Sequence, residues 1–359
     1  MISNSLSVLC INLSNIKKNY QYLKEKVGKK VSVVPVLKSD AYGVGVREVA
    51  ISLKESGCSE FYVATIDEGI ALREILDSVR IYVLFGVNKG QEYYFLKYHL
   101  TPVLNNEYQI DLWLKCSEGV GEKLDACLHV DIGMTRLAIA KDNFDKCVKN
   151  ISNKLEIHYV LGHLSASEDK SNNFNKEQLK EFTEIRNRFP QFQYSLSNSG
   201  GIFLGDEYHF DQVRPGIALY GTGSKNFERM HPVITLTSEL INIFYNNKVV
   251  TIGYGCTYTA KIGTIIAAVP FGYGDGYPLS LSNVGYCFIN NSKVPIVGRI
   301  SMDCMSLDIS SVSESEQKIG QKVEIIGDNM SVADLASLAG TIDYNILTLL
   351  GHRYKREYV

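Results

Sequence analysis

The sequence predicts an α/β protein: a parallel (β/α)8 barrel followed by a mainly antiparallel β domain. Two observations predict the barrel, namely short runs rich in β-branched residues and the helical-looking stretches between them. The runs occupy residues 31–37, 60–66, 79–85, 101–104, 125–132, 156–163, 192–198 and 211–220. A third observation, the loss of helical periodicity after residue 231, predicts that a second domain begins there.

The stretches between the runs have the apolar spacing of amphipathic helices. In the clearest one, at 173–188, Phe174, Phe182 and Ile185 recur near helical spacing with charged residues between them. Similar stretches occupy 12–27, 46–56, 67–76 and 105–115. Periodicity does not separate a closed barrel from an open doubly wound sheet, so the open sheet stays an alternative at this point.

The pattern beyond residue 231 is that of an antiparallel β domain. Alternating strands are expected at 232–240, 263–269 and 322–326, with short helices at 331–339 and 344–350. The predicted domains are therefore 1–231 and 232–359, and a chain of 359 residues is long enough for both.

Composition is that of an ordinary globular protein. Hydrophobic residues make up 45% of the chain and charged residues 21%, and the net charge of −2 does not favour nucleic acid as a partner. The eight cysteines form no CxxC and no zinc-type spacing, so we expect reduced thiols and no metal site. Because no leader and no long apolar run is visible, we expect a cytoplasmic protein that does not enter a membrane.

Lys38 is the first candidate for chemistry. It directly follows the apolar run 31–37, and the carboxyl ends of barrel strands form the active sites of such enzymes. Burial disfavours a charged amine and lowers its pKa, and a neutral amine forms a Schiff base with an aldehyde. The alternative is an ordinary surface lysine at the end of a strand.

Two further loops follow the last two runs. The segment 197–201 contains Asn198, Ser199 and two glycines, which allow backbone N–H groups to approach a phosphate closely; the alternative is a polar turn. Arg214 precedes Pro215 and Gly216 inside an apolar run, where an arginine needs a partner. That partner is either a ligand or a carboxylate such as Asp211.

Three more polar residues stand at informative positions. Arg136 closes the segment 131–136 after the fifth run and suits a carboxylate ligand, and His163 ends the sixth run. Tyr254 lies between two glycines, which would expose its phenol. Taken singly, a histidine and a tyrosine such as His163 and Tyr254 are more often structural residues.

Seven segments together resemble the alanine racemase family of pyridoxal 5′-phosphate (PLP) enzymes. In order they are VVPVLKSDAYGVG, HVDIGMTRL, SNSGG, VRPGIALYG, GYGCTYTA, GYGDGY and GRISMD, and the resemblance runs from about residue 30 to the C-terminus. The resemblance implies the barrel and β domain, the interconversion of L- and D-alanine, and a supply of D-alanine for peptidoglycan. It also implies a head-to-tail homodimer in which the β domain of one subunit completes the active site of the other.

The resemblance assigns roles residue by residue. Lys38 would bind PLP covalently and act as one base, and Tyr254 of the partner subunit would be the second base. Arg214 would face the pyridine nitrogen, and Arg136 would support the phenolic oxygen of PLP and the substrate carboxylate. The other assignments are Tyr42, Asn198, Ser199, Gly216, Ile217 and Tyr344 at the cofactor, Met302 and Asp303 of the partner subunit at the substrate, and His163 orienting Arg214 and Tyr254.

Racemisation suits these residue types, because a proton must leave one face of Cα and another must arrive on the opposite face. A phenol has a reference pKa of about 10, and positive charge from Arg214 and from a protonatable His163 would lower it. Arginine stays protonated and therefore donates a hydrogen bond to the pyridine nitrogen rather than a proton.

The sequence departs from the family pattern at two positions. Many members carry a carboxylated lysine where His129 stands, and histidine forms no comparable stable carbamate. We therefore expect Arg136 to be held by a bound anion or by another carboxylate. Ser301 stands where a cysteine is common, and we expect little effect from it.

Rival functions share parts of this pattern. PLP decarboxylases of the same architecture usually place a glutamate, not an arginine, against the pyridine nitrogen, so Arg214 argues against them. A non-catalytic PLP carrier is generally a single barrel, so the segment 232–359 argues against it. A racemase with broader amino-acid specificity stays open.

Overall fold

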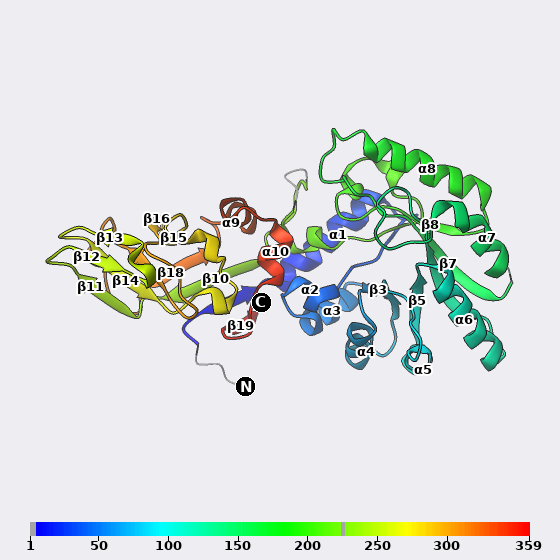
Figure 1. Cartoon of the computed structure of the whole chain (residues 1–359), viewed down its shortest axis with the longest axis horizontal. Helices are drawn as coiled ribbons and strands as arrows, with labels where there is room; N and C mark the ends of the chain where they lie inside the picture. Colours follow the sequence, from blue (N-terminus) through cyan, green and yellow to red (C-terminus); the bar gives the residue numbers. More distant parts are fainter. Residues whose placement is uncertain (1–4, 152, 224–226) are drawn as a thin grey trace. The chain divides into compact units, whose positions relative to one another are not determined.

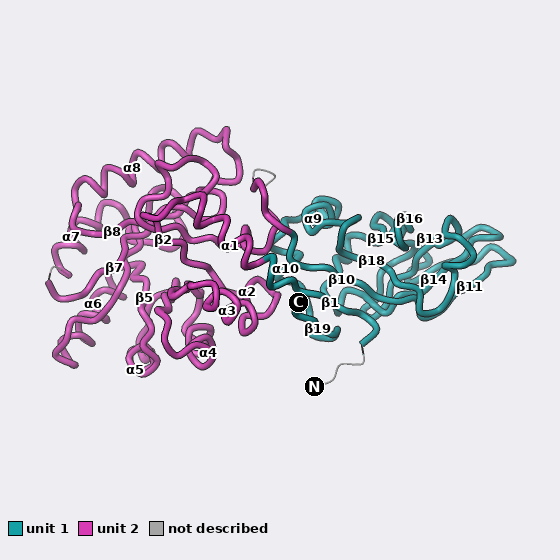
Figure 2. Tube along the Cα trace, turned by 180° about the vertical axis from the view of Figure 1, so that it is seen from behind, with its two compact units in different colours: residues 1–15, 232–359 teal, residues 16–231 magenta. Residues whose placement is uncertain are grey.

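The structure is a computed structural model that describes residues 5–151, 153–223 and 227–359. The chain divides into two compact units (Figure 2). One, the barrel unit, is Ile16–His231; the other, the β unit, joins Pro232–Val359 to the N-terminal residues up to Asn15.

Eight strands of the described residues form the parallel sheet of the barrel unit, in the order β2-β9-β8-β7-β6-β5-β4-β3. They are β2 (Ser32–Val33), β3 (Glu60–Val63), β4 (Arg80–Val83), β5 (Leu100–Leu104), β6 (Leu124–His129), β7 (Leu155–Leu161), β8 (Gln193–Ser195) and β9 (Gln212–Val213). A parallel bridge between Val36 and Tyr62 joins the two outer strands. The sheet therefore closes into a TIM-type barrel, and the open-sheet alternative is wrong.

Side chains from successive strands fill the barrel interior, as in other TIM-type barrels. Tyr62 stacks on Tyr82 with ring centroids 4.6 Å apart, and its hydroxyl donates to Gln212 Oε1. The buried cluster around this pair comprises Val34, Val36, Val103, Cys127, Tyr159 and Leu161. The interior is thus packed, which leaves the strand ends as the place for a site.

Helices follow the strands on the outside of the barrel (Figure 1). They are α1 (Leu13–Val27), α2 (Lys38–Tyr42), α3 (Val46–Glu55), α4 (Ile66–Ile75), α5 (Glu92–Lys97), α6 (Glu107–Val120), α7 (Lys141–Ile151) and α8 (Phe174–Arg188). All five stretches with helical spacing in the sequence are confirmed as α1, α3, α4, α6 and α8. In α8 the apolar residues Phe182 and Ile185 are buried, as their spacing predicted.

The last predicted run, 211–220, is a strand only at its start. Strand β9 ends at Val213, and a 3-10 helix, η3 (Ile217–Tyr220), follows. Backbone pairing continues as far as Pro215, whose carbonyl accepts from Val36 N at 2.9 Å. Proline has no N–H to extend the ladder, so the chain leaves the sheet there and Arg214 stands at the strand end.

The β unit is mainly antiparallel, as predicted. Its strands form sheets in the orders β16-β15-β18-β10-β1-β19, β11-β14-β17 and β12-β13. They are β1 (Val8–Ile11), β10 (Ile234–Glu239), β11 (Asn242–Tyr245), β12 (Val250–Ile252), β13 (Tyr258–Ala260), β14 (Ile265–Val269), β15 (Tyr286–Ile289), β16 (Ser292–Pro295), β17 (Met305–Asp308), β18 (Lys322–Ile326) and β19 (Lys355–Tyr358). The expected short helices are α9 (Val332–Ala339) and α10 (Asp343–Thr348).

The N-terminal segment differs from the sequence prediction, which placed residues 1–231 in one domain. Strand β1 pairs with β10 on one side and with β19 on the other, so it belongs to the β unit. Leu9 and Ile11 point into the core of that unit and are fully buried. The pairing joins strands more than two hundred residues apart, which local periodicity does not reveal.

Short 3-10 helices complete the description: η1 (Gly201–Phe203), η2 (Asp206–Tyr208), η4 (Tyr254–Cys256), η5 (Tyr273–Asp275) and η6 (Leu279–Leu281), besides η3. Within the described ranges, no helix is both long and apolar enough to span a membrane.

Candidate active site

Lys38 stands at the carboxyl end of the first barrel strand, where the sequence predicted it. The strand run before it is fixed on both sides: Val36 N donates to Pro215 O at 2.9 Å, and Leu37 N donates to Tyr62 O at 2.8 Å. Burial, and next the positive charge of Arg136, lower the pKa of the Lys38 amine, while the Glu68 carboxylate opposes that shift. A larger share of the amine is therefore neutral, as a nucleophile or base requires.

The turn after Lys38 is left-handed. Ser39, Asp40 and Ala41 have φ between 53° and 54°, and Tyr42 has φ 58°. This conformation costs an L-residue roughly 1–2 kcal/mol. Four such residues in succession need strong support from their surroundings, and the turn directs Tyr42 into the buried interior, where it packs on Tyr220 with ring centroids 5.1 Å apart.

The two loops predicted to hold a phosphate are joined by one hydroxyl. Ser199 Oγ accepts from Gly216 N at 2.9 Å and from Ala218 N at 3.2 Å, and Ser199 is buried. Tyr42 lies directly against Gly216, since a β-carbon at that position would fall 2.7 Å from Tyr42 Cζ. Ser199, Gly216 and Tyr42 therefore form one close-packed wall beside the start of η3, which we call the cradle; Ile217 is the first residue of η3.

Asn198 fixes the loop that carries Ser199 by hydrogen bonds to its neighbours. Its Oδ1 accepts from Ser167 Oγ at 2.7 Å and from Gly201 N at 3.0 Å. A β-carbon on Gly200 would lie 2.8 Å from the Ser167 backbone carbon, so this position admits only glycine without rearrangement. The loop 197–201 is thus tightly packed, and its binding of a phosphate stays a prediction.

Arg214 is buried and holds its guanidinium with carbonyl oxygens rather than with a carboxylate. Nη1 donates to Ser195 O at 2.8 Å, and Nη2 donates to Gly162 O at 2.6 Å. The suggested ion pair with Asp211 is wrong, because Asp211 accepts from Tyr194 N instead. Among the described residues Nε of Arg214 has no acceptor, so one donor of the fixed cation is left for a ligand.

His129, Arg136 and His163 line one small pocket at the ends of β6 and β7. Burial, then the charge of Arg214, lowers the pKa of His129 to about 3. The same two causes, in the same order, hold the pKa of His163 well below its usual value. Both rings are therefore neutral at pH 7, and the expectation that a protonated His163 adds positive charge is wrong: burial among cations prevents it.

The support of Arg136 also differs from expectation. Asp131, the nearest acidic residue in sequence, turns its Oδ1 to the N–H groups of Gly133, Met134 and Thr135. Arg136 is exposed, and in the part of the chain that the structure describes no carboxylate pairs with it. The expected carboxylate partner is absent there because the one near candidate is used by the loop itself.

His129 has a partner that the sequence analysis missed. Its Nδ1 lies 3.0 Å from Asn105 Oδ1, and Asn105 is in turn fixed by donating to Leu84 O and Val103 O. Since the amide oxygen accepts, Nδ1 of the neutral ring carries the proton. The local sequence around His129 could not reveal this partner, because Asn105 follows a different strand.

The β unit carries the other four predicted residues: Tyr254, Met302, Asp303 and Tyr344. Tyr254 begins η4 and is 72% exposed, with Gly253 and Gly255 both at φ 72°. A β-carbon on Gly253 would lie 3.1 Å from Arg299 N. The loop of Tyr254 therefore packs on the loop that leads to Met302 and Asp303.

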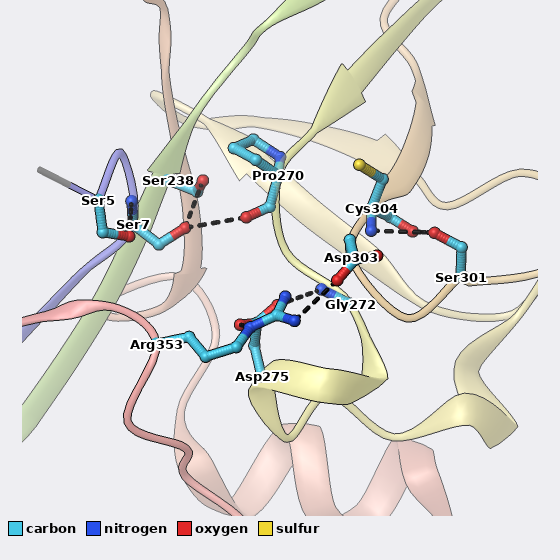
Figure 3. Close-up of polar contacts among 10 residues, drawn as sticks. All are labelled: Ser5, Ser7, Ser238, Pro270, Gly272, Asp275, Ser301, Asp303, Cys304 and Arg353. Carbon is cyan, nitrogen blue, oxygen red and sulfur yellow. Dashed lines mark hydrogen bonds and ion pairs between the residues drawn. The ribbon is translucent and has the colours of Figure 1, made fainter.

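An arginine fastens the loop of Met302 and Asp303 (Figure 3). Arg353 donates from Nε and Nη2 to both oxygens of the buried Asp275, at 2.8 and 3.1 Å, and from Nη1 to Asp303 Oδ1 at 2.7 Å. Gly274 N also donates to Met302 O at 2.9 Å. This network, which the sequence analysis missed, holds Met302 at a fixed place although its side chain is half exposed.

These observations first define a class. A closed barrel with a desolvated lysine at a strand end, a glycine-lined cradle beside it and a separate antiparallel unit is the architecture of barrel enzymes that carry a second, β domain.

Comparisons with known proteins agree. The family model described as alanine racemase, N-terminal domain, matches residues 11–224, and the one described as alanine racemase, C-terminal domain, matches residues 233–358. Alanine racemases of Rickettsia canadensis (strain McKiel) and Rickettsia africae (strain ESF-5) are 40% and 41% identical to this chain, each comparison covering 99% of both chains. The chain belongs to the alanine racemase family of PLP-dependent enzymes.

Solved structures of the family have the same fold. The alanine racemase from Bartonella henselae, with covalently bound pyridoxal phosphate, superposes with a TM-score of 0.94 at 34% identity and covers 98% of this chain and 99% of its own. The alanine racemase from Bacillus anthracis with bound L-Ala-P has a TM-score of 0.89 at 26% identity, over 99% and 95% of the two chains.

Proposed function

We propose that this protein is a PLP-dependent alanine racemase that interconverts L- and D-alanine and supplies D-alanine for peptidoglycan. The observation that carries the proposal is the full-length match at 40% identity to an alanine racemase, together with a lysine of lowered pKa at the barrel end. The free thiols of all eight cysteines support a reducing, cytoplasmic location.

The residues present fit PLP. An aldehyde requires a neutral amine, which the lowered pKa of Lys38 favours. The Tyr42 phenol can lie against the Gly216 backbone only because that residue lacks a β-carbon, which keeps a hydroxyl donor beside the backbone N–H groups of the cradle. Tyr42, Ser199, Gly216, Ile217 and Tyr344 would hold the phosphate end, and Asn198 would support their loop. Arg214 Nε would donate to the ring nitrogen. When bound, the cofactor supplies an electron-withdrawing ring that weakens the bond between Cα and its hydrogen.

Two residues would move the protons. Lys38 Nζ would take or deliver the proton on one face of Cα, and Oη of Tyr254 of the partner subunit would do so on the other. Arg214 supplies the fixed positive charge, because His163 is neutral. His163 would act by shape and hydrogen bonding, and Arg136 would bind the substrate carboxylate, for which an exposed guanidinium without a carboxylate partner in the described residues is available.

The proposal includes a homodimer. Tyr254, Met302 and Asp303 stand on adjoining loops of the β unit with exposed side chains, as residues would that complete the site of a second copy. Met302 and Asp303 would bound the substrate in that arrangement.

A proton NMR time course of L-alanine in D2O with the PLP-loaded protein tests the function. Loss of the α-proton signal with D-alanine as product is expected, whereas ethylamine would indicate a decarboxylase. No change with PLP bound would refute the proposal. Tyr254→Phe keeps one base, so it should exchange the α-proton of a single enantiomer with retention and lose interconversion, while Lys38→Ala should lose both.

A further inference from the structure

The left-handed turn Ser39–Tyr42 begins at the residue after Lys38, so its geometry sets the direction in which the lysine leaves the strand. L-residues disfavour this conformation, and it persists only where the surroundings hold it. The turn therefore needs a fastening at each end.

The far end of the turn is held by its own residues. Gly43 N donates to Ser39 O at 2.8 Å, and Asp40 Oδ1 accepts from Val46 N at 2.7 Å, which also starts α3. Nearer the lysine, Ala41 N donates to Leu37 O at 3.0 Å, a bond that spans Lys38. The end next to Lys38 begins with the N–H of Ser39, which has no acceptor inside a turn that it starts.

A carboxylate from another helix receives that N–H. Glu68 Oε1 accepts from Ser39 N at 2.7 Å, while its Oε2 accepts from Ala64 N at 2.7 Å and Thr65 N at 3.1 Å. Glu68 is the third residue of α4 and forms a capping box with Thr65. One side chain thus caps α4 with one oxygen and holds the turn with the other.

We propose that Glu68 is a positioning residue for the reaction, which fastens the turn Ser39–Tyr42 to α4 and thereby fixes the Lys38 amine. The proposal rests on the proposed function for the role of Lys38. A second effect has the same source: the negative charge of Glu68 raises the pKa of Lys38 against burial and Arg136. Glu68 therefore sets both the place of the amine and its protonation.

The substitution Glu68→Gln separates these contacts, because both carboxylate oxygens accept from N–H groups. A glutamine has one acceptor and one donor, so its NH2 must face either Ser39 N or Ala64 N, donor against donor. Thr65→Ala is the matched control for the cap: it removes the acceptor of Glu68 N and leaves both Glu68 oxygens in place. Glu74→Gln, on the exposed side of the same helix, controls for the lost charge.

Amide hydrogen exchange of residues 38–45 in the protein without cofactor is the first readout. We expect exchange in this segment to rise about tenfold or more in Glu68→Gln and to stay unchanged in Thr65→Ala and Glu74→Gln. Should Glu68→Gln fail to fold, Glu68→Asp keeps the charge and the acidic helix start but withdraws the carboxylate from Ser39, and the same rise is expected.

The holoenzyme gives the second readout. A displaced base costs rate more than binding, so kcat should fall about 10–100-fold in Glu68→Gln with little change in KM. The acidic limb of the pH–rate profile, which reports the protonation of Lys38, should move to lower pH in Glu68→Gln. The reason is that the pKa of Lys38 falls when the carboxylate charge is removed. Unchanged exchange in Glu68→Gln, or an equal rise in Thr65→Ala, would overturn the proposal. If exchange behaves as expected and wild type does not racemise alanine, the proposed function fails while the fastening of the turn stands.

Discussion

The phenol of Tyr42 lies against the α-carbon of Gly216 so closely that no β-carbon fits between them. Both residues are buried, and Ser199 fixes the Gly216 backbone from the other side with its hydroxyl. The atoms that a β-carbon would meet belong to the buried Tyr42 ring, which packs on Tyr220, so any larger residue at position 216 requires that ring to shift.

Gly216→Ala should therefore open the cradle and weaken cofactor binding. Overpacking of this kind costs about 1–3 kcal/mol of stability, and the affinity for PLP should fall with it. Gly119→Ala is the control: this glycine near the end of α6 has no atom within 4 Å of the added carbon, and alanine in a helix gains about 0.5–1 kcal/mol. Titration with PLP and urea unfolding measure both quantities; unaltered PLP affinity in Gly216→Ala would contradict the cradle.

Asp275 and Asp303 share Arg353, yet one is buried and the other exposed. Asp275→Asn should cost about 1.5–3 kcal/mol of unfolding free energy, because a buried charged hydrogen-bond acceptor is lost. Asp303→Asn should cost about 0–1 kcal/mol, as for a surface ion pair, but raise KM for alanine if Asp303 bounds the substrate. Unfolding and steady-state kinetics on the same two variants distinguish the roles. Equal losses of stability would contradict the contrast in burial.

Most of the barrel was predictable because its strands are local signals. Each β-branched run corresponds to one strand of the closed sheet, and the apolar spacing of α8 gave its buried face. Strand β1 was not predictable in this way, because its partners β10 and β19 are distant in sequence. The run 211–220 was predicted to be a strand throughout, but Pro215 ends the backbone pairing and a 3-10 helix follows.

The same division holds for the candidate site. The sequence placed Lys38 at a strand end and Arg214 within the last strand run, but it did not identify the groups that hold these side chains. The contact of Asn105 with His129 depends on the packing of neighbouring strands. The predicted positive charge of His163 was wrong, because burial among cations keeps its ring neutral and only the fold reveals that burial. Glu68 was within reach of sequence analysis as the end of a Thr-x-x-Glu capping box, although its bond to Ser39 was not.

Activity should not depend on carbon dioxide. A lysine at position 129 would be carboxylated, but the His129 ring is neutral and bonded to Asn105. We expect the same kcat in CO2-free buffer and in bicarbonate-supplemented buffer. His129→Lys is the matched variant, because burial beside Arg214 would keep its amine neutral and reactive, and its activity should rise with bicarbonate. A wild-type rate that drops when CO2 is removed would contradict the assignment.

Stability should fall as the pH is lowered below about 6.5. The pKa of His129 is about 3 in the folded protein, so between pH 3 and the unfolded value the unfolded chain binds the additional proton. The free energy of unfolding therefore rises with pH in this window. Above the window, titration of His129 no longer changes it. From His129 alone we expect about 2 kcal/mol less stability at pH 5 than at pH 7.

Urea unfolding at several pH values measures this dependence. His129→Asn removes the titrating ring while its amide still donates to Asn105, so the slope below pH 6.5 should decrease by about one proton. The exposed His352, changed in the same way, serves as the control. A slope in His129→Asn equal to that of wild type would show that the folded protein accepts the proton on His129.

Mixing two inactive variants tests whether active sites are shared between subunits. Lys38 belongs to the barrel unit and Tyr254 to the β unit. In a head-to-tail homodimer, a mixed dimer of Lys38→Ala and Tyr254→Phe contains one site with both native residues and one with neither. Because random exchange makes half of the dimers mixed, activity should recover to about a quarter of wild type. If each subunit instead builds its site from its own Lys38 and Tyr254, every site lacks one base and the mixture stays as inactive as its components, which would refute the shared arrangement while leaving the racemase proposal intact.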